Sequence, residues 1–155
     1  MRTLKPILFL AALIVAATSH AAGLSEQSVR ELIAKMDQAA RTRSIEPLAE
    51  VLSDDAVIRV TVHIERRKRV LDLTKEDYLE MVRRGWARAS AYTFQRTALD
   101  ITIQNPERAR VTTEVLESLS VQGQSMQGRT RQEATVELRR GRPRITRLDA
   151  TAAPI

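Results

Sequence analysis

The sequence predicts an α+β fold, in which helices from the first half of the chain cover a sheet formed by the second half. Between residues 25 and 54, and again between 74 and 89, apolar side chains recur at the three- and four-residue spacing of amphipathic helices. From residue 91 to residue 151, apolar and polar side chains alternate in long segments separated by short turns, as in antiparallel strands. Helices followed by a run of strands are typical of α+β domains.

The first 21 residues have the pattern of a cleavable export signal. Arg2 and Lys5 give a positive start, and residues 6–17 are almost purely apolar. Small residues at Ser19 and Ala21 mark a cleavage site after Ala21, with cleavage after Ala22 as the alternative. The apolar segment is shorter than the roughly 20 residues needed to span a bilayer. We therefore expect a mature domain of residues 22–155 that has no membrane span and is periplasmic or secreted. The chain has no Cys, so it has neither a lipid anchor nor disulfides.

Two helices are predicted at the start of the mature chain. The first extends to about Arg43, with Ser25 or Ser28 as its cap and a capping box between Ser28 and Glu31. Its apolar face is formed by Val29, Leu32, Ile33, Met36 and Ala40, and its polar face by Arg30, Glu31, Lys35 and Asp37. A short second helix begins after Ser44, with Pro47 in its first turn, and is predicted to end at Asp54-Asp55.

A half-buried strand is predicted over residues 56–63, where apolar and polar side chains alternate. The basic run Arg66-Arg67-Lys68-Arg69 follows as a charged loop or an extension of this strand, and contact with anionic lipid or with polyanionic envelope material is the alternative role for it. Thr74 then caps a third helix, which extends to about Ala89. Tyr78, Met81, Val82 and Trp86 are expected on one face of this helix.

Four strands complete the chain, over residues 92–104, 108–121, 129–139 and 144–151. The turns between them contain Asn105-Pro106, the Gly-, Gln- and Ser-rich segment 123–128, and Arg140-Gly141-Arg142-Pro143. Short turns between consecutive strands predict a meander.

The basic excess of the chain indicates a solvated surface and not a nucleic-acid site. Loss of the signal removes two of the 25 basic residues and none of the 19 acidic ones, which leaves a net charge of +4. Nucleic-acid binding calls for clustered cations interleaved with aromatic residues. In this chain acidic residues interrupt most basic stretches, and only 3% of the residues are aromatic.

Three stretches give the sequence a resemblance to the nuclear transport factor 2-like superfamily, which includes ketosteroid isomerases and SnoaL-like proteins. They are ARTRSIEPLAEVLSDDAVIRV, TKEDYLEMVRRGWARA and TVELRRGRPRITRLDA. The resemblance implies a cystatin-like fold, in which a curved antiparallel sheet wraps around three N-terminal helices to form a cone. It also implies an apolar pocket at the open end, and frequent dimers through the outer face of the sheet.

The ketosteroid isomerase mechanism finds no support in the residues at the matching positions. The resemblance places the catalytic base at Val60, the oxyanion-binding tyrosine at Met36 and the late-strand acid at Ala134. Aliphatic side chains neither accept a proton nor donate a hydrogen bond. His63 is the sole histidine outside the signal, and we expect it on the surface, so a transition-metal site is not predicted.

Glu117 is the candidate functional residue, because it shares its strand face with Val115, Leu119 and other apolar side chains. A carboxylate in such a position must be paired, hydrogen-bonded or at the mouth of a cavity. It would then anchor a ligand, or transfer protons with a raised pKa. The simpler alternative is that it lies at a bulge or pairs with an arginine of a neighbouring strand.

Gln132, Tyr78, Trp86 and Tyr92 complete the set of candidate ligand-binding residues. Gln132 is expected on the inward face of the next strand, and the three aromatic side chains belong either to the core or to the wall of a pocket.

We expect from these features a non-enzymatic exported domain with no cofactor. It would bind a small apolar or amphipathic molecule, or an envelope protein, in or around the cone. The alternatives are an isomerase, dehydratase or hydrolase that uses Glu117, and a homodimeric assembly module whose Arg- and Glu-bearing strands pair across the interface.

Overall fold

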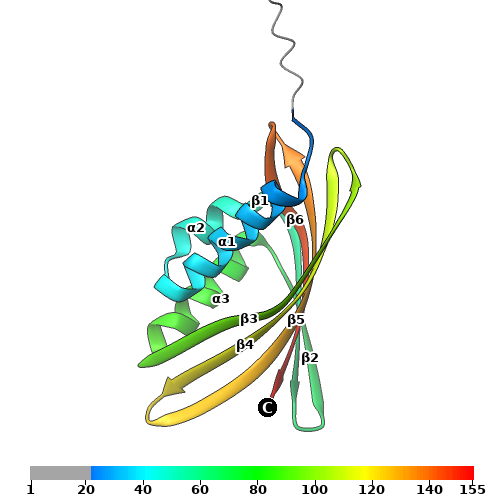
Figure 1. The fold of residues 1–155 in the computed structure, drawn as a ribbon. Coiled ribbons are helices and arrows are strands. Elements are labelled where there is room, and N and C mark those ends of the chain that lie inside the picture. Colours follow the sequence, from blue (N-terminus) through cyan, green and yellow to red (C-terminus); the bar gives the residue numbers. More distant parts are fainter. Residues whose placement is uncertain (1–21) are drawn as a thin grey trace, which may run out of the picture.

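A computed structural model describes residues 22–155, in which helices cover one face of a six-stranded sheet (Figure 1). The predicted export signal, residues 1–21, lies outside the described residues. Along the chain the elements are α1 (Glu26–Thr42), α2 (Ile45–Val51), β1 (Leu52–Ile64), β2 (Arg67–Leu73), α3 (Lys75–Arg88), β3 (Ala91–Asn105), β4 (Arg108–Val121), β5 (Gln124–Arg139) and β6 (Arg142–Pro154). Of the helices within this range, none has the length and hydropathy needed to cross a membrane.

The sheet has the strand order β2-β1-β6-β5-β4-β3 and is strongly curved (Figure 1). The predicted meander β3–β6 is confirmed, and each of its strands pairs antiparallel with the next. One pairing differs from the purely antiparallel expectation, because β1 lies parallel to β6. This parallel pair joins the N-terminal strands to the meander, so a single mixed sheet forms one wall of the molecule.

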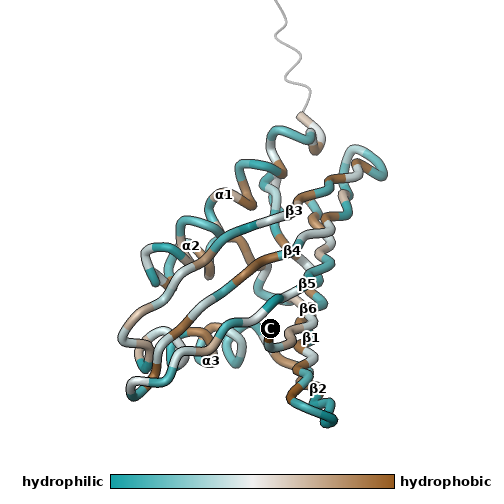
Figure 2. Tube along the Cα trace, turned by 60° about the horizontal axis from the view of Figure 1, so that its bottom comes forward, coloured by the Kyte–Doolittle hydropathy of each residue, from teal (hydrophilic) through white to brown (hydrophobic). Residues whose placement is uncertain are grey.

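The core lies between the helices and the concave face of this sheet. Apolar residues recur along both layers (Figure 2). The predicted apolar face of α1 is buried, as are alternate residues of β1, β4, β5 and β6; among the most deeply buried side chains are those of Val29, Ile58, Val111, Val136, Ile145 and Leu148. The alternation that predicted the strands therefore selects the side chains that fill the core.

The ends of the helices differ from prediction in two details. Ser25 caps α1, and its capping box is formed with Ser28 instead of the predicted pair of Ser28 and Glu31. Helix α2 ends at Val51, so Asp54 and Asp55 belong to an irregular, bulged start of β1 and do not terminate the helix. In α3 the Thr74 cap is confirmed, since its hydroxyl accepts from the Asp77 amide.

Three further predictions about segments and faces are wrong. In the basic run, Arg66 lies in a tight turn, but Arg67, Lys68 and Arg69 begin a separate strand, β2, which forms a hairpin with β1. The segment 123–128 is not a long connection, because β5 already begins at Gln124 after a tight turn at Gln122-Gly123, both with positive φ. Met81 is exposed on the outer side of α3.

The outer face of the sheet carries cross-strand pairs of arginine with carboxylates. Examples are Arg108 with Glu137 at 2.6 Å and Arg110 with Glu133 at 2.9 Å, both between β4 and β5. Glu114 likewise faces Arg131 across the same strands. These charges, which were candidates for pairing across a dimer interface, have partners within one chain.

Candidate functional site

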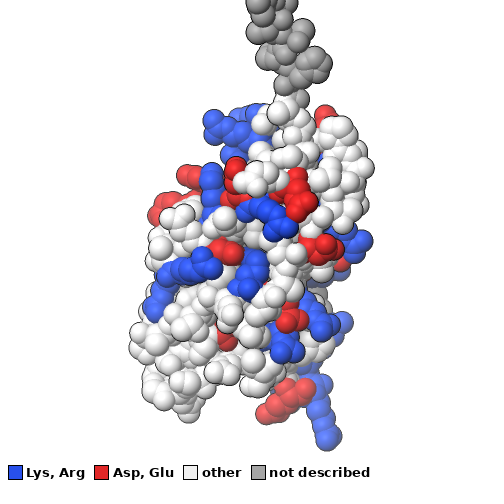
Figure 3. Space-filling model, in the orientation of Figure 1, with Lys and Arg blue, Asp and Glu red and all other residues white. Residues whose placement is uncertain are grey.

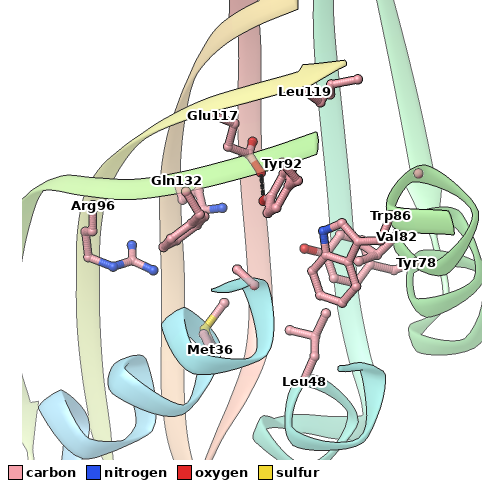
Figure 4. A pocket seen from close by; sticks show the side chains of 13 residues that line it. Met36, Leu48, Tyr78, Val82, Trp86, Tyr92, Arg96, Glu117, Leu119 and Gln132 are labelled. Carbon is pink, nitrogen blue, oxygen red and sulfur yellow. Dashed lines mark hydrogen bonds between the residues drawn. The ribbon is translucent and has the colours of Figure 1, made fainter. Parts of the chain in front are cut away.

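A cavity of about 210 Å³ lies between the three helices and strands β3, β4 and β5 (Figure 4). Most of its wall is apolar. The lining side chains and backbone belong to Met36, Ala40, Leu48, Tyr78, Val82, Gly85, Trp86, Tyr92, Phe94, Arg96, Glu117, Leu119 and Gln132.

All five candidate residues predicted from the sequence line this cavity. Tyr78 and Trp86 are eight residues apart on α3, which places them on the same helix face. Tyr92, Glu117 and Gln132 lie on the inward faces of β3, β4 and β5. In the sheet, Tyr92 pairs with Leu119 and Gln132 pairs with Thr113. Both of these β4 partners lie on the same strand face as Glu117, so the three candidate residues face the same side of the sheet.

Glu117 is held by Tyr92, whose hydroxyl donates a hydrogen bond of 2.5 Å to its Oε1 (Figure 4). Neither of the simpler alternatives for Glu117 applies. It pairs regularly with Phe94 and Gly128 in the sheet, without a bulge. Its partner is also a tyrosine and not an arginine. Glu117 is thus a carboxylate on a cavity wall with one oxygen engaged.

Tyr92 is itself fixed by contacts on its other sides. The Trp86 ring lies 6.3 Å from the Tyr92 ring, centre to centre, in a tilted arrangement. On another side, the Arg43 guanidinium stands over the Tyr92 ring at 5.8 Å and donates a hydrogen bond to the Ala89 carbonyl. Arg43 therefore connects the end of α1 to the start of β3, and this connection orients the Tyr92–Glu117 pair.

Burial keeps both tyrosines of the cavity protonated. Burial, with a smaller contribution from the nearby Glu117 carboxylate, raises the pKa of Tyr78 to about 12. The pKa of Tyr92 is also raised, first by burial and then by Glu117, whose charge and hydrogen bond both favour the neutral phenol. Both hydroxyls can therefore act as hydrogen-bond donors over the whole physiological pH range.

We predict that the protein loses stability in alkali because of Tyr78. A folded-state pKa above the unfolded value of 10.0 means that the folded chain holds this proton more tightly. The resulting stabilisation is complete below about pH 10 and is lost as the pH rises towards 12. By about pH 11 the unfolding free energy should have fallen about 1 kcal/mol further in the wild type than in Tyr78→Phe. Urea unfolding of both proteins at pH 8 and pH 11 measures this difference, and equal losses would contradict the assignment.

Several polar groups facing the cavity have unused hydrogen-bonding capacity. The side chains of Tyr78 and Gln132 line the cavity (Figure 4). Within residues 22–155, the Tyr78 hydroxyl and the Gln132 side-chain amide have no hydrogen-bond partner. The second oxygen of Glu117 is free of protein donors in the same range. These groups can accept from or donate to a molecule inside the cavity.

A buried ion pair at one end of the cavity was not predicted from the sequence. Arg96, at the cavity wall, donates to Asp37 of α1 through Nε at 2.9 Å and through Nη2 at 2.5 Å, and to Thr113 Oγ1. Asp37 is only 14% exposed, so its predicted place on the polar face of α1 is wrong. The sequence did indicate that Arg96 faces inward, because it lies two and four residues from Phe94 and Tyr92 and so shares their strand face.

The positions tested for the ketosteroid isomerase mechanism do not form a polar site. Val60 and Ala134 are buried in the core away from the cavity lining, while Met36 contributes an apolar side chain to the wall. His63 is exposed, as expected. Within the described part of the chain, no three His, Cys, Asp or Glu side chains are grouped so as to hold a metal ion.

Comparison with solved structures identifies the fold. The chain is similar to a conserved protein from Planctomyces limnophilus DSM 3776, with a TM-score of 0.70 and 19% identity over 84% of this chain and 97% of the other. It is similar to the hexachlorocyclohexane dehydrochlorinase LinA-type3 from Novosphingobium barchaimii LL02, with a TM-score of 0.66 and 18% identity over 83% and 88% of the two chains. It is also similar to a protein with a cystatin-like fold from Caulobacter vibrioides, with a TM-score of 0.64 and 14% identity over 81% and 87%.

These similarities confirm that the chain has the fold of the nuclear transport factor 2-like superfamily. The fold accommodates enzymes, such as the dehydrochlorinase, but at these identities it does not assign an activity. No protein-family model and no curated protein matches the sequence.

Proposed function

We propose that this protein is an exported binding protein that holds a small amphipathic molecule in the cavity between its helices and sheet. The observation that carries the proposal is the Tyr92–Glu117 pair, a fixed polar anchor on the wall of an otherwise mostly apolar cavity. Ligand sites commonly combine a concave apolar surface with a few convergent polar groups.

The size of the cavity limits the ligand to about one ring. A dry protein cavity of about 150 Å³ holds benzene. The 210 Å³ of this cavity therefore accommodates a single ring with a short substituent. Larger molecules would have to extend through the mouth.

The polar groups of the cavity favour a ligand that carries a hydrogen-bond donor. The free oxygen of Glu117 accepts, so a hydroxyl or amino group is its natural partner. Arg96 adds little net charge because Asp37 neutralises it. The body of the ligand would lie against Trp86, Val82 and Leu48.

Native mass spectrometry of the purified mature protein tests this proposal. We expect a small molecule to be retained by the wild type and absent from Ala40→Phe, because a large side chain at Ala40 would occupy the cavity from α1. A molecule retained equally by both proteins would be bound elsewhere. Absence from both would contradict tight binding.

A second candidate function is proton transfer by Glu117 in an isomerase, dehydratase or hydrolase. It is favoured by the direct hydrogen bond between a carboxylate and a phenol in an apolar cavity, an arrangement suited to general acid–base chemistry. Glu117→Gln retains the shape of the side chain and removes its basicity. Undiminished turnover of a substrate by this variant would exclude the catalytic role.

A further inference from the structure

The β1–β2 hairpin projects from one end of the molecule. Its strands pair from Ile58–Leu73 out to Ile64–Arg67, and Glu65 closes the turn with a φ of 54°. Every residue from 63 to 70 is exposed. The hairpin tip extends beyond the layer of helices, at the end opposite the β5–β6 turn (Figure 1).

This tip, which we define as residues 63–70, carries four consecutive cations, from Arg66 to Arg69. Within residues 22–155, no carboxylate forms an ion pair with any of the four. Glu65 is the sole acidic residue of the tip. Lys and Arg side chains are visible at this end of the surface (Figure 3). By contrast, most arginines on the outer sheet face have carboxylate partners, so the tip keeps a net positive charge.

The same tip exposes two large aliphatic side chains. Ile64 is 61% exposed and Val70 is 45% exposed. The register places Ile64 beside Arg67 on one face of the hairpin, and Val70 on the same face as Lys68 on the other. Both faces therefore present aliphatic groups next to cations.

We propose that this hairpin tip docks on a lipid surface that contains anionic headgroups. The cations complement lipid phosphates, and Ile64 and Val70 enter the interfacial region between headgroups and acyl chains. The inference is independent of the ligand in the cavity, because no residue of the tip lines that cavity.

Neither edge protection nor nucleic-acid binding fits both the cations and the aliphatic side chains of the tip. Basic residues on an edge strand protect it from pairing with other chains, but exposed Ile64 and Val70 would work against such protection. Binding of single-stranded nucleic acid relies mainly on large aromatic side chains for base stacking, and residues 52–73 contain no Phe, Tyr or Trp. An anionic lipid surface matches both features at once.

Vesicle flotation of the purified mature protein tests the proposal. We expect binding to vesicles rich in phosphatidylglycerol, no binding to phosphatidylcholine alone, and weakening of the binding by salt. Each cation near an anionic surface contributes about a fivefold gain in binding, so Arg67→Gln/Arg69→Gln should bind about 25-fold more weakly. Ile64→Ser/Val70→Ser should reduce the part of the binding that persists in high salt.

Arg140→Gln/Arg142→Gln is the matched control, because it removes the same charge at the opposite end of the molecule. This control should bind as the wild type does. An equal loss in the control, or failure of the wild type to bind anionic vesicles, would overturn the proposal. A wild type that binds single-stranded RNA but not the vesicles would overturn it in favour of nucleic acid. Circular dichroism verifies that each variant is folded.

Discussion

Asp37→Ala is expected to lower the unfolding free energy by about 3 kcal/mol, the largest effect on stability that we predict for a single substitution. The Asp37 and Arg96 side chains are 14% and 8% exposed, and both nitrogens that Arg96 directs to Asp37 bond the same oxygen. Removal of the carboxylate leaves the guanidinium buried without a charged partner. Breaking a buried pair in this way costs about 3–5 kcal/mol.

Urea unfolding at neutral pH measures this effect. Glu26→Ala on the same helix is the control, because its pair with Arg30 is half exposed and should contribute less than about 1 kcal/mol. Replacement of both partners, as in Asp37→Leu/Arg96→Met, should recover much of the loss, since no buried charge remains. A loss of stability in Asp37→Ala no larger than in Glu26→Ala would contradict the assigned burial.

Glu117→Val is expected to weaken the binding of benzylamine by about 10- to 100-fold. A hydrogen bond to a charged group contributes about 1.5–3 kcal/mol, which corresponds to this range of affinity. Benzylamine is chosen as the probe because its ring matches the cavity and its amino group can donate to the free oxygen of Glu117. Isothermal titration calorimetry provides the measurement.

Glu114→Val is the control for this effect, because Glu114 lies on the same strand but faces Arg129 and Arg131 on the outer side of the sheet. It should bind benzylamine as the wild type does. Toluene, which lacks the donor, should lose no affinity in Glu117→Val. Equal benzylamine affinity in the wild type and Glu117→Val would exclude Glu117 as the anchor.

The fold could be predicted from the sequence wherever burial imposed a period on the chain. The bounds predicted for β4 agree with the structure, because buried residues from Ala109 to Val115 alternate with more exposed ones. Strand β2 was missed for the opposite reason. Four of its residues in succession are exposed, so its sequence RKRVLDL carries little alternation, and its existence depends on pairing with β1. The bulged start of β1 likewise depends on β6, which lies about ninety residues later.

The candidate site was predictable in part, because helix spacing and strand parity identify the residues that face inward. These two rules brought Tyr78, Trp86 and Glu117 to one cavity. The partners of those residues were not predictable. The Tyr92–Glu117 bond joins residues 25 apart, and the Asp37–Arg96 pair joins residues 59 apart. Such pairs depend on how the sheet curves towards α1, which no local pattern encodes.

Fluorescence of Trp86 tests the central claim most directly, because Trp86 is the only tryptophan of the chain and lines the cavity. The measurement is a titration with single-ring alcohols and amines, such as benzyl alcohol and benzylamine, in the wild type and in Ala40→Phe. The proposal predicts a saturable change in Trp86 emission in the wild type that is absent from Ala40→Phe. No change with any of these probes, or the same change in both proteins, would contradict a ligand site in this cavity.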